Sequence, residues 1–207
     1  SSLLSSLGRR AERVCDEFNS QDIANTLWAL CVVSSPPSLS SVLFAKMATI
    51  QFNEKQRSQL HLVFESVMLA LPAEERLPSR LDSLAAEFRR EFAGQSHDGS
   101  TESQLQREVC AAVRAAVGGR KDDDGEVRVS EERVLEQDGC GYSVDALLTG
   151  PGVACGGRGV VVEVDGPSHF VSPDNRQNGS TLLKHRLLRG KGWVVVSVPY
   201  FEWDALE

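Results

Sequence analysis

One stretch of the sequence, residues 160–170, limits what this chain can fold into more than any other. It reads Val-Val-Val-Glu-Val-Asp-Gly-Pro-Ser-His-Phe, an apolar run that stops at a Gly-Pro pair. Because the side chains of a strand alternate between its two faces, Glu163 and Asp165 share one face, and Val162 and Val164 the other. Two neighbouring carboxylates on a buried strand are costly unless a metal ion, a basic helix or an arginine offsets their charge. Much of the function depends on which of these is present.

The second half of the chain has the pattern of an α/β domain. Residues 141–148 and 193–199 are predicted strands, and a short helix capped by Ser180 or Thr181 precedes the second of them. This last strand is almost continuously apolar, which predicts that it is buried on both faces. The pattern indicates a small sheet with helices on its faces.

Residues 1–93 are predicted to be helical. Asn19 has the properties of an N-cap, and the triplet Gln-Phe-Asn at 51–53 repeats the Glu-Phe-Asn at 17–19 after 34 residues. This recurrence predicts stacked helical hairpins, although a plain helical bundle would give much the same pattern. The polar, glycine-containing residues 94–102 are the expected linker, so that residues 103–207 form the second domain.

Charge and composition limit the partners less than they first suggest. The net charge is −7, whereas proteins that bind nucleic acid usually carry a basic patch. Eight acidic and only two basic residues lie between Asp122 and Asp138, and the remainder is close to neutral. The segment is predicted to be a solvated loop, in which the alternation of residues 126–130 indicates a short strand. The five cysteines include no CxxC pair, which argues against a zinc site and suits a reducing compartment. No apolar run approaches the ~18 residues of a membrane span, so no membrane partner is expected.

Four motifs occur in order along the second half. They are Gly141-Tyr-Ser-Val-Asp145, Val162-Glu-Val-Asp-Gly-Pro-Ser-His-Phe170, Thr181-Leu-Leu-Lys-His-Arg-Leu-Leu188 and Gly192-Trp-Val-Val-Val-Ser-Val-Pro-Tyr-Phe-Glu-Trp203. Together they resemble a RAP domain over roughly residues 100–207, a domain abundant in apicomplexan parasites and taken to bind RNA. The helical half, with its Phe-Asn-Ser-Gln-Asp-Ile-Ala-Asn-Thr-Leu-Trp-Ala-Leu, resembles octotricopeptide-type repeats and the helical regions of FAST-kinase-like mitochondrial proteins.

The resemblance implies a restriction-endonuclease-like fold for the α/β half. In that fold an Asp and a downstream Glu-x-Lys bind a divalent metal, and the lysine assists the attacking water. Asp145 matches the first acid and Glu163 the second, but Asp165 stands where the lysine belongs, which favours a protein that is not an enzyme. Lys184 on the following helix is a candidate substitute. A nuclease would use Asp145, Glu163 and Lys184 as catalytic residues, with Asp145, Glu163 and Asp165 as ligands of Mg²⁺ or Mn²⁺. Otherwise no cofactor is expected.

In the non-catalytic interpretation, Arg176, Lys184 or Arg186 holds the two carboxylates and the surrounding side chains bind RNA. A basic cluster on the last helix and an aromatic side chain suited to base stacking support this interpretation. The cluster equally suits a solvated helix face, and a lone histidine is more often bonded to its neighbours. The candidate RNA contacts are Asp165, His169, Arg176, Lys184, His185, Arg186, Arg189, Lys191 and Tyr200.

The resemblance therefore implies an organellar RNA-binding protein that acts in RNA metabolism or translation. A structural, rRNA-binding subunit of a mitochondrial ribosome is a specific form of this hypothesis. Its partners would be organellar rRNA or mRNA and ribosomal or other ribonucleoprotein proteins, in the mitochondrion or alternatively the chloroplast. Two other hypotheses stay open: a metal-dependent endoribonuclease, and a protein-interaction module without direct RNA contact.

Overall fold

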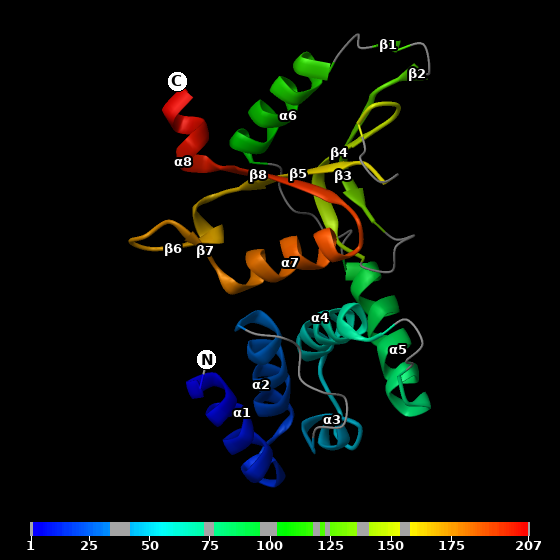
Figure 1. The fold of residues 1–207 in the computed structure, drawn as a ribbon, viewed down its shortest axis with the longest axis vertical. Helices are drawn as coiled ribbons and strands as arrows, with labels where there is room; N and C mark the ends of the chain where they lie inside the picture. Colours follow the sequence, from blue (N-terminus) through cyan, green and yellow to red (C-terminus); the bar gives the residue numbers. More distant parts are fainter. Residues whose placement is uncertain are drawn as a thin grey trace. The chain divides into compact units, whose positions relative to one another are not determined.

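The chain divides into two compact units, Ser1–Gln95 and Ser96–Glu207, which are described separately (Figure 1). The computed structural model describes residues 2–33, 42–72, 77–95, 103–117, 121–122, 125–135, 141–153 and 158–206.

The described part of the first unit is helical. Helix α2 packs on α4, and α4 packs on α5, around a core of apolar side chains that includes Ile23, Phe44 and Phe64. The last helix includes Gly94 and Gln95, which the sequence placed in the linker; residues 96–102 lie outside the described residues. The elements are α1 (Ser2–Val14), the short 3-10 helix η1 (Cys15–Glu17), α2 (Ser20–Val33), α3 (Val42–Met47), α4 (Glu54–Ala70) and α5 (Ser79–Gln95).

The recurring Phe-Asn pair begins a helix in both places. Asn19 Oδ1 accepts the N–H groups of Gln21 (2.8 Å) and Asp22 (3.1 Å) at the start of α2. At the start of α4, Asn53 Oδ1 accepts the N–H of Gln56, and Gln56 Oε1 accepts the N–H of Asn53, both at 3.0 Å. The predicted N-cap at Asn19 is therefore confirmed, and the same cap recurs 34 residues later because the same residue type closes the first turn.

The second unit is built on a four-stranded sheet with the strand order β3-β4-β5-β8. Strands β3 and β4 and strands β4 and β5 are antiparallel, whereas β5 and β8 are parallel and are joined through helix α7. The main elements are α6 (Gln104–Val117), β3 (Arg128–Val134), β4 (Ser143–Thr149), β5 (Val160–Asp165), α7 (Gly179–Gly190), β8 (Val194–Pro199) and α8 (Tyr200–Trp203). Four shorter strands, β1 (Lys121–Asp122), β2 (Gly125–Glu126), β6 (Phe170–Val171) and β7 (Arg176–Gln177), and the 3-10 helices η2 (Pro167–His169) and η3 (Asp204–Leu206) complete the described part.

Helices α6 and α7 lie on opposite sides of the sheet (Figure 1). Val162 and Val164 of β5 belong to one apolar cluster with Val109 and Cys110 of α6. The alternate β5 side chains point to the other face, where α7 buries its leucines. Glu163 and Asp165 therefore lie beneath α7, in the α/β arrangement that the sequence predicts.

Three sequence predictions are wrong in this unit. The acidic segment between Asp122 and Asp138 is not a solvated loop with only a short strand at 126–130, because β3 continues to Val134 and pairs with β4 along its length. Strand β8 is not buried on both faces: it is an edge strand, and Val194 and Val196 are 41% and 44% exposed. Helix α7 is capped by Asn178, whose Oδ1 accepts the N–H of Thr181 at 3.0 Å, rather than by Ser180 or Thr181.

The outer edge of β8 is partly occupied. The guanidinium of Arg189, near the end of α7, donates to the carbonyl of Val195 at 3.3 Å. Pro199 ends the strand and has no N–H to offer a further strand. Among the described helices, none combines the length and the apolar character that crossing a membrane requires.

Candidate functional site

Asp165, at the end of β5, connects four elements of the second unit through its side chain. We call Asp145, Glu163, Asp165 and the side chains that bind them the polar centre of this unit. Oδ1 of Asp165 lies 2.7 Å from Nδ1 of His169, in the turn that follows β5. Its Oδ2 accepts the side-chain amide of Gln177 on β7 at 2.9 Å and the hydroxyl of Ser197 on β8. Nε2 of His185 on α7 lies 3.8 Å from the same oxygen. Asp165 is 1% exposed, so the structure places this predicted RNA contact in the interior, where it joins neighbouring elements.

Glu163 is balanced by a lysine from α7. Lys184 Nζ lies 2.6 Å from Glu163 Oε2, and Glu163 is 2% exposed. Lys184 also lies 5.8 Å from the ring centroid of Tyr142, close enough for a cation–π contact. Of the three basic residues expected to hold the carboxylates, Lys184 does so, whereas Arg176 pairs with Asp174 at 3.0 Å.

Asp145, on β4, lies in the same polar centre. Its Oδ2 accepts the backbone N–H of Val164 on β5 at 2.6 Å. The structure therefore brings Asp145, Glu163 and Lys184 together from β4, β5 and α7. Sequence positions alone do not reveal that a backbone N–H already occupies one oxygen of the first acid.

Burial and hydrogen bonding move the pKa values of the carboxyl groups in opposite directions. Burial raises the pKa of Glu163 to about 7, although the charge of Lys184 opposes the shift. Burial also raises the pKa of Asp145, against the hydrogen bond from Val164. At Asp165 burial is outweighed by the hydrogen bonds from His169 and Ser197, so its pKa lies below the usual value.

The two histidines also differ. The hydrogen bond to Asp165 raises the pKa of His169, whose side chain is 41% exposed. Burial lowers the pKa of His185, which is 1% exposed. His169 is thus a surface group whose charged form persists to higher pH than that of a free histidine, whereas His185 lies in the core of the unit, away from solvent.

The three carboxylates do not fit a divalent metal site as they are arranged. Both oxygens of Asp165 and one oxygen each of Glu163 and Asp145 are engaged by protein donors. Within the described ranges, no group of three or more His, Cys, Asp or Glu side chains is arranged to hold a metal ion. Oxygen ligands of Mg²⁺ or Mn²⁺ must face a common point, and these face their own donors.

The remaining candidate RNA contacts lie at or near the surface of the second unit. Arg186 and Arg189 are exposed on the outer side of α7, together with Leu182, which is 49% exposed. Arg176 is exposed on β7, and Lys191, just after α7, is partly exposed. We call Arg176, Arg186, Arg189 and Lys191 the outer basic residues.

The aromatic side chains after β5 and β8 contact one another. The ring of Phe170 lies 5.8 Å from that of Tyr200 and 5.2 Å from that of Phe201, measured between centroids. Tyr200 is partly buried in this group, so most of its ring area serves packing. A base stacked on Tyr200 would contact a ring that already packs against Phe170 and Phe201.

Gln177, Ser197 and Asn178 are parts of this centre that no sequence pattern identified. Gln177 also donates to the Ser197 hydroxyl at 3.1 Å, and Asn178 donates to the Ser168 carbonyl at 2.8 Å. These side chains tie the turn after β5, the β6–β7 hairpin and the start of α7 to one carboxylate. The signal that could have found them is the Asn-Gly at 178–179, which marks a turn and also supplies the helix cap.

The second unit of the chain is similar to known proteins. The family model described as the RAP domain matches residues 162–207. A rice protein (Oryza sativa subsp. japonica) named "RAP domain-containing protein, chloroplastic" is 39% identical over 67 residues, which is 32% of this chain. The match covers 9% of that protein's length.

Proposed function

We propose that this chain, which carries a RAP domain at residues 162–207, binds RNA through the outer side of α7 and the adjoining β6–β7 hairpin. A RAP domain suggests an RNA-binding function, and the described arrangement provides a surface for it. Arg176 lies on β7 beside Gln177, which binds Asp165, whereas Arg186, Arg189 and Lys191 follow along the second half of α7 and just after it. Cationic side chains on a pre-organised surface bind phosphates and account for most sequence-independent affinity.

His169 is the contact that the buried centre prepares most directly. Asp165 binds Nδ1 of its ring at 2.7 Å, which leaves Nε2 as the atom available to a ligand. Because this bond raises the pKa of His169, the imidazolium form persists closer to neutral pH and is suited to a phosphate oxygen. Asp165 is thus proposed to orient His169 toward the RNA without contacting the RNA itself.

The cellular setting is part of the proposal. The name of the rice relative places that protein in the chloroplast, and we infer an organellar location for this chain. A role in organellar RNA metabolism or translation follows, with rRNA or mRNA as the ligand. Attachment to a mitochondrial ribosome as a structural subunit is one specific form, and the helical unit, as a repeat array, would extend the contact.

The experiment that tests RNA binding is a charge reversal on α7. Arg186→Glu should weaken binding of a fluorescent single-stranded RNA about tenfold at low salt and reduce the salt dependence of the affinity, because a phosphate contact is lost and a repulsive charge is gained. Arg133→Glu, an exposed position on β3 at the other edge strand, is the matched control.

Equal affinity of the two variants would contradict the proposed surface. If the wild-type chain bound no RNA at all, the hypothesis of a protein-interaction module would take its place.

A second candidate function is cleavage of organellar RNA, because Lys184 reaches Glu163 at 2.6 Å and Asp145 lies in the same polar centre. The lysine absent from the Glu-x-Lys position is thus replaced in space by one from α7, in the manner of restriction-endonuclease-like folds. Because the carboxylates as arranged do not form a divalent metal site, such cleavage would require them to rearrange around an added metal ion. RNA incubated with the wild-type chain and Mg²⁺ or Mn²⁺ should then be cut, and Asp145→Ala should abolish the cleavage. RNA that stays intact under all conditions would remove this candidate and leave binding.

A further inference from the structure

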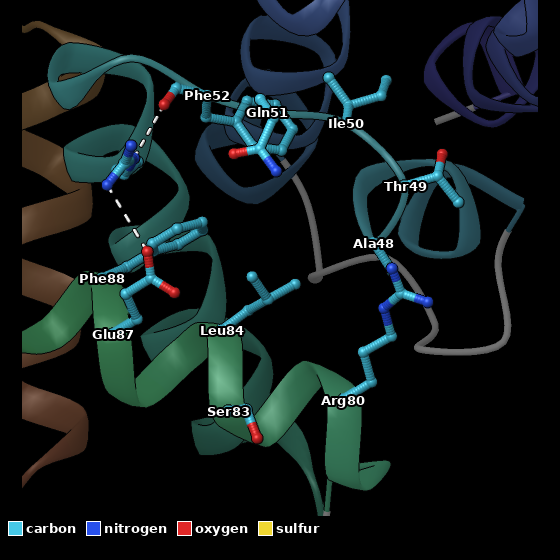
Figure 2. Close-up of a pocket in the computed structure, with 11 residues that line it drawn as sticks. Ala48, Thr49, Ile50, Gln51, Phe52, Arg80, Ser83, Leu84, Glu87 and Phe88 are labelled. Atoms are coloured by element: carbon cyan, nitrogen blue, oxygen red, sulfur yellow. Dashed lines mark hydrogen bonds and ion pairs between the residues drawn. The ribbon is translucent and has the colours of Figure 1, made fainter.

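A pocket of about 270 Å³ lies in the helical unit. Figure 2 shows it between the segment Ala48–Phe52, which joins α3 to α4, and one side of α5. The α5 residues that line it are Arg80, Ser83, Leu84, Glu87 and Phe88. Ligand pockets in proteins commonly begin at roughly 300 Å³, so this one suits a small ligand or a single unit of a polymer.

The inner wall of the pocket is apolar and partly aromatic. The rings of Phe52 and Phe88 meet edge to face with centroids 6.3 Å apart, and both side chains are buried. Leu84 and Ile50 are partly buried beside them and pack against the same core. Because both rings are buried, a flat ring placed here would replace water mainly on Leu84 and Ile50, which are partly exposed and pack against the core that contains the aromatic pair.

The end of the pocket beside Phe88 carries a carboxylate. Glu87 lies 3.5 Å from the guanidinium of Arg57, and its side chain is 46% exposed. Arg57 makes closer contacts elsewhere, to the carbonyl of Phe52 at 2.8 Å and to Glu91 at 2.6 Å. Glu87 can therefore still accept hydrogen bonds from a ligand. Arg57 instead joins α4 to α5.

The opposite end carries a cation. Arg80 is exposed, and among the described residues it takes part in no ion pair. It lies in the first turn of α5, where the helix dipole adds to the positive potential. In Figure 2 its side chain extends from α5 toward the segment at Ala48, away from Glu87. The pocket thus offers an acceptor at one end, an apolar wall in the middle and a cation at the other end.

We propose that this pocket binds one unpaired nucleotide of the RNA. The base lies against the apolar wall, its N–H groups donate to Glu87, and its phosphate pairs with Arg80. Proteins recognise unpaired RNA bases in this way, by packing one face and hydrogen-bonding the base edge. Guanine is the best match because its N1–H and N2–H groups lie side by side and suit a carboxylate. The inference rests on the proposed RNA binding and assigns it a second point of contact.

The probe is guanosine 5′-monophosphate, titrated into the full chain by calorimetry. Saturable binding is expected, and Arg80→Ala should weaken it at least tenfold because a charged hydrogen bond to phosphate is lost. Glu87→Gln should reduce the preference for guanosine over uridine monophosphate. Arg90→Ala, an exposed arginine on the same helix that does not line the pocket, should bind as the wild type does.

Several results would overturn the inference, and each is separable from the test on α7. They are no saturable binding of guanosine monophosphate, unchanged binding by Arg80→Ala, and binding of inorganic phosphate as tight as that of the nucleotide. RNA affinity that depends on Arg186 but not on Arg80 would retain the proposed function and reject this pocket. Nucleotide binding without any RNA binding would reject the proposed function and reduce the pocket to a mononucleotide site.

Discussion

The two units of the chain differ in how they place charge. In the helical unit, the ion pair Arg57–Glu91 lies at the surface between helices, with side chains about a third exposed, and the buried carboxylate of Glu65 pairs with a single arginine, Arg89, at 2.9 Å. In the α/β unit, Glu163 and Asp165 lie beneath α7 and are almost completely buried. The helical unit therefore combines caps and apolar packing with one buried pair between α4 and α5, whereas in the α/β unit a network of buried polar side chains joins several loops and a helix.

Because of this difference, we expect the stability of the α/β unit to depend more strongly on mutation of its charged residues and on pH. Exposed ion pairs contribute roughly 0–1 kcal/mol, whereas the loss of one partner in a buried, hydrogen-bonded charge network costs several. The tryptophans allow the two units to be followed separately, since Trp28 belongs to the first unit and Trp193 and Trp203 to the second.

The largest effect is expected from Asp165→Ala. Removal of this carboxylate leaves His169, Gln177 and Ser197 without their common acceptor and should lower the free energy of unfolding of the α/β unit by about 3–5 kcal/mol. Urea denaturation followed by Trp193 and Trp203 fluorescence, in a Trp28→Phe background, measures it. Asp165→Asn keeps the shape and should cost less. A loss below about 1 kcal/mol for the alanine variant would break the comparison between the units.

A smaller, pH-dependent effect is expected from Glu163→Gln. Because the folded-state pKa of Glu163 is raised from 4.5 to about 7, the native state holds a proton that the unfolded state has released between these pH values. The contribution of Glu163 to the free energy of unfolding is fully present below pH 4.5 and is lost as the pH rises through about 7. The total loss is about 3 kcal/mol.

The check is the difference between the pH profiles of wild type and variant, because Lys184, Asp145 and Asp165 surround the site in both. Unfolding free energies measured from pH 4 to pH 8 should show the decline in the wild type and a flatter profile in Glu163→Gln. Parallel profiles would mean that Glu163 does not retain its proton in the folded state.

The smallest effect is expected in the helical unit. Asn53→Ala removes the capping box of α4 and should lower the free energy of unfolding by about 1 kcal/mol, as loss of an N-cap commonly does. Asn19→Ala should cost a similar amount, because the same cap opens α2. Denaturation followed by Trp28 fluorescence measures both. A cost for Asn53→Ala close to that of Asp165→Ala would mean that polar groups matter equally in both units.

The sequence predicted those features that local patterns determine. The apolar run of β5 and the capping preference of Asn19 act within a few residues, so they could be recognised without knowledge of the fold. The shared face of Glu163 and Asp165 follows from strand geometry alone. The expectation that Lys184 lies near the strand ends required only that the helix pack on the sheet.

Features that depend on distant segments were not predictable. Ser197 binds Asp165 across 32 residues of sequence, and nothing near Ser197 marks it as a partner. The alternation at 126–130 predicts the first part of β3, whereas its continuation to Val134 is masked by charged side chains that face solvent on an edge strand. The exposure of Val194 and Val196 depends on β8 being last in the sheet, which is a property of topology and not of composition.

The outer edge of β8 has a consequence for how the protein behaves at high concentration. An edge strand with exposed valines is a template for pairing with other chains, and such pairing leads to aggregation. Here Arg189 donates a hydrogen bond to the carbonyl of Val195, and Pro199 has no N–H group. An incoming strand could therefore not form hydrogen bonds at these two positions. Arg189 is one of the outer basic residues and also limits pairing at this edge, so its loss should promote aggregation at high protein concentration.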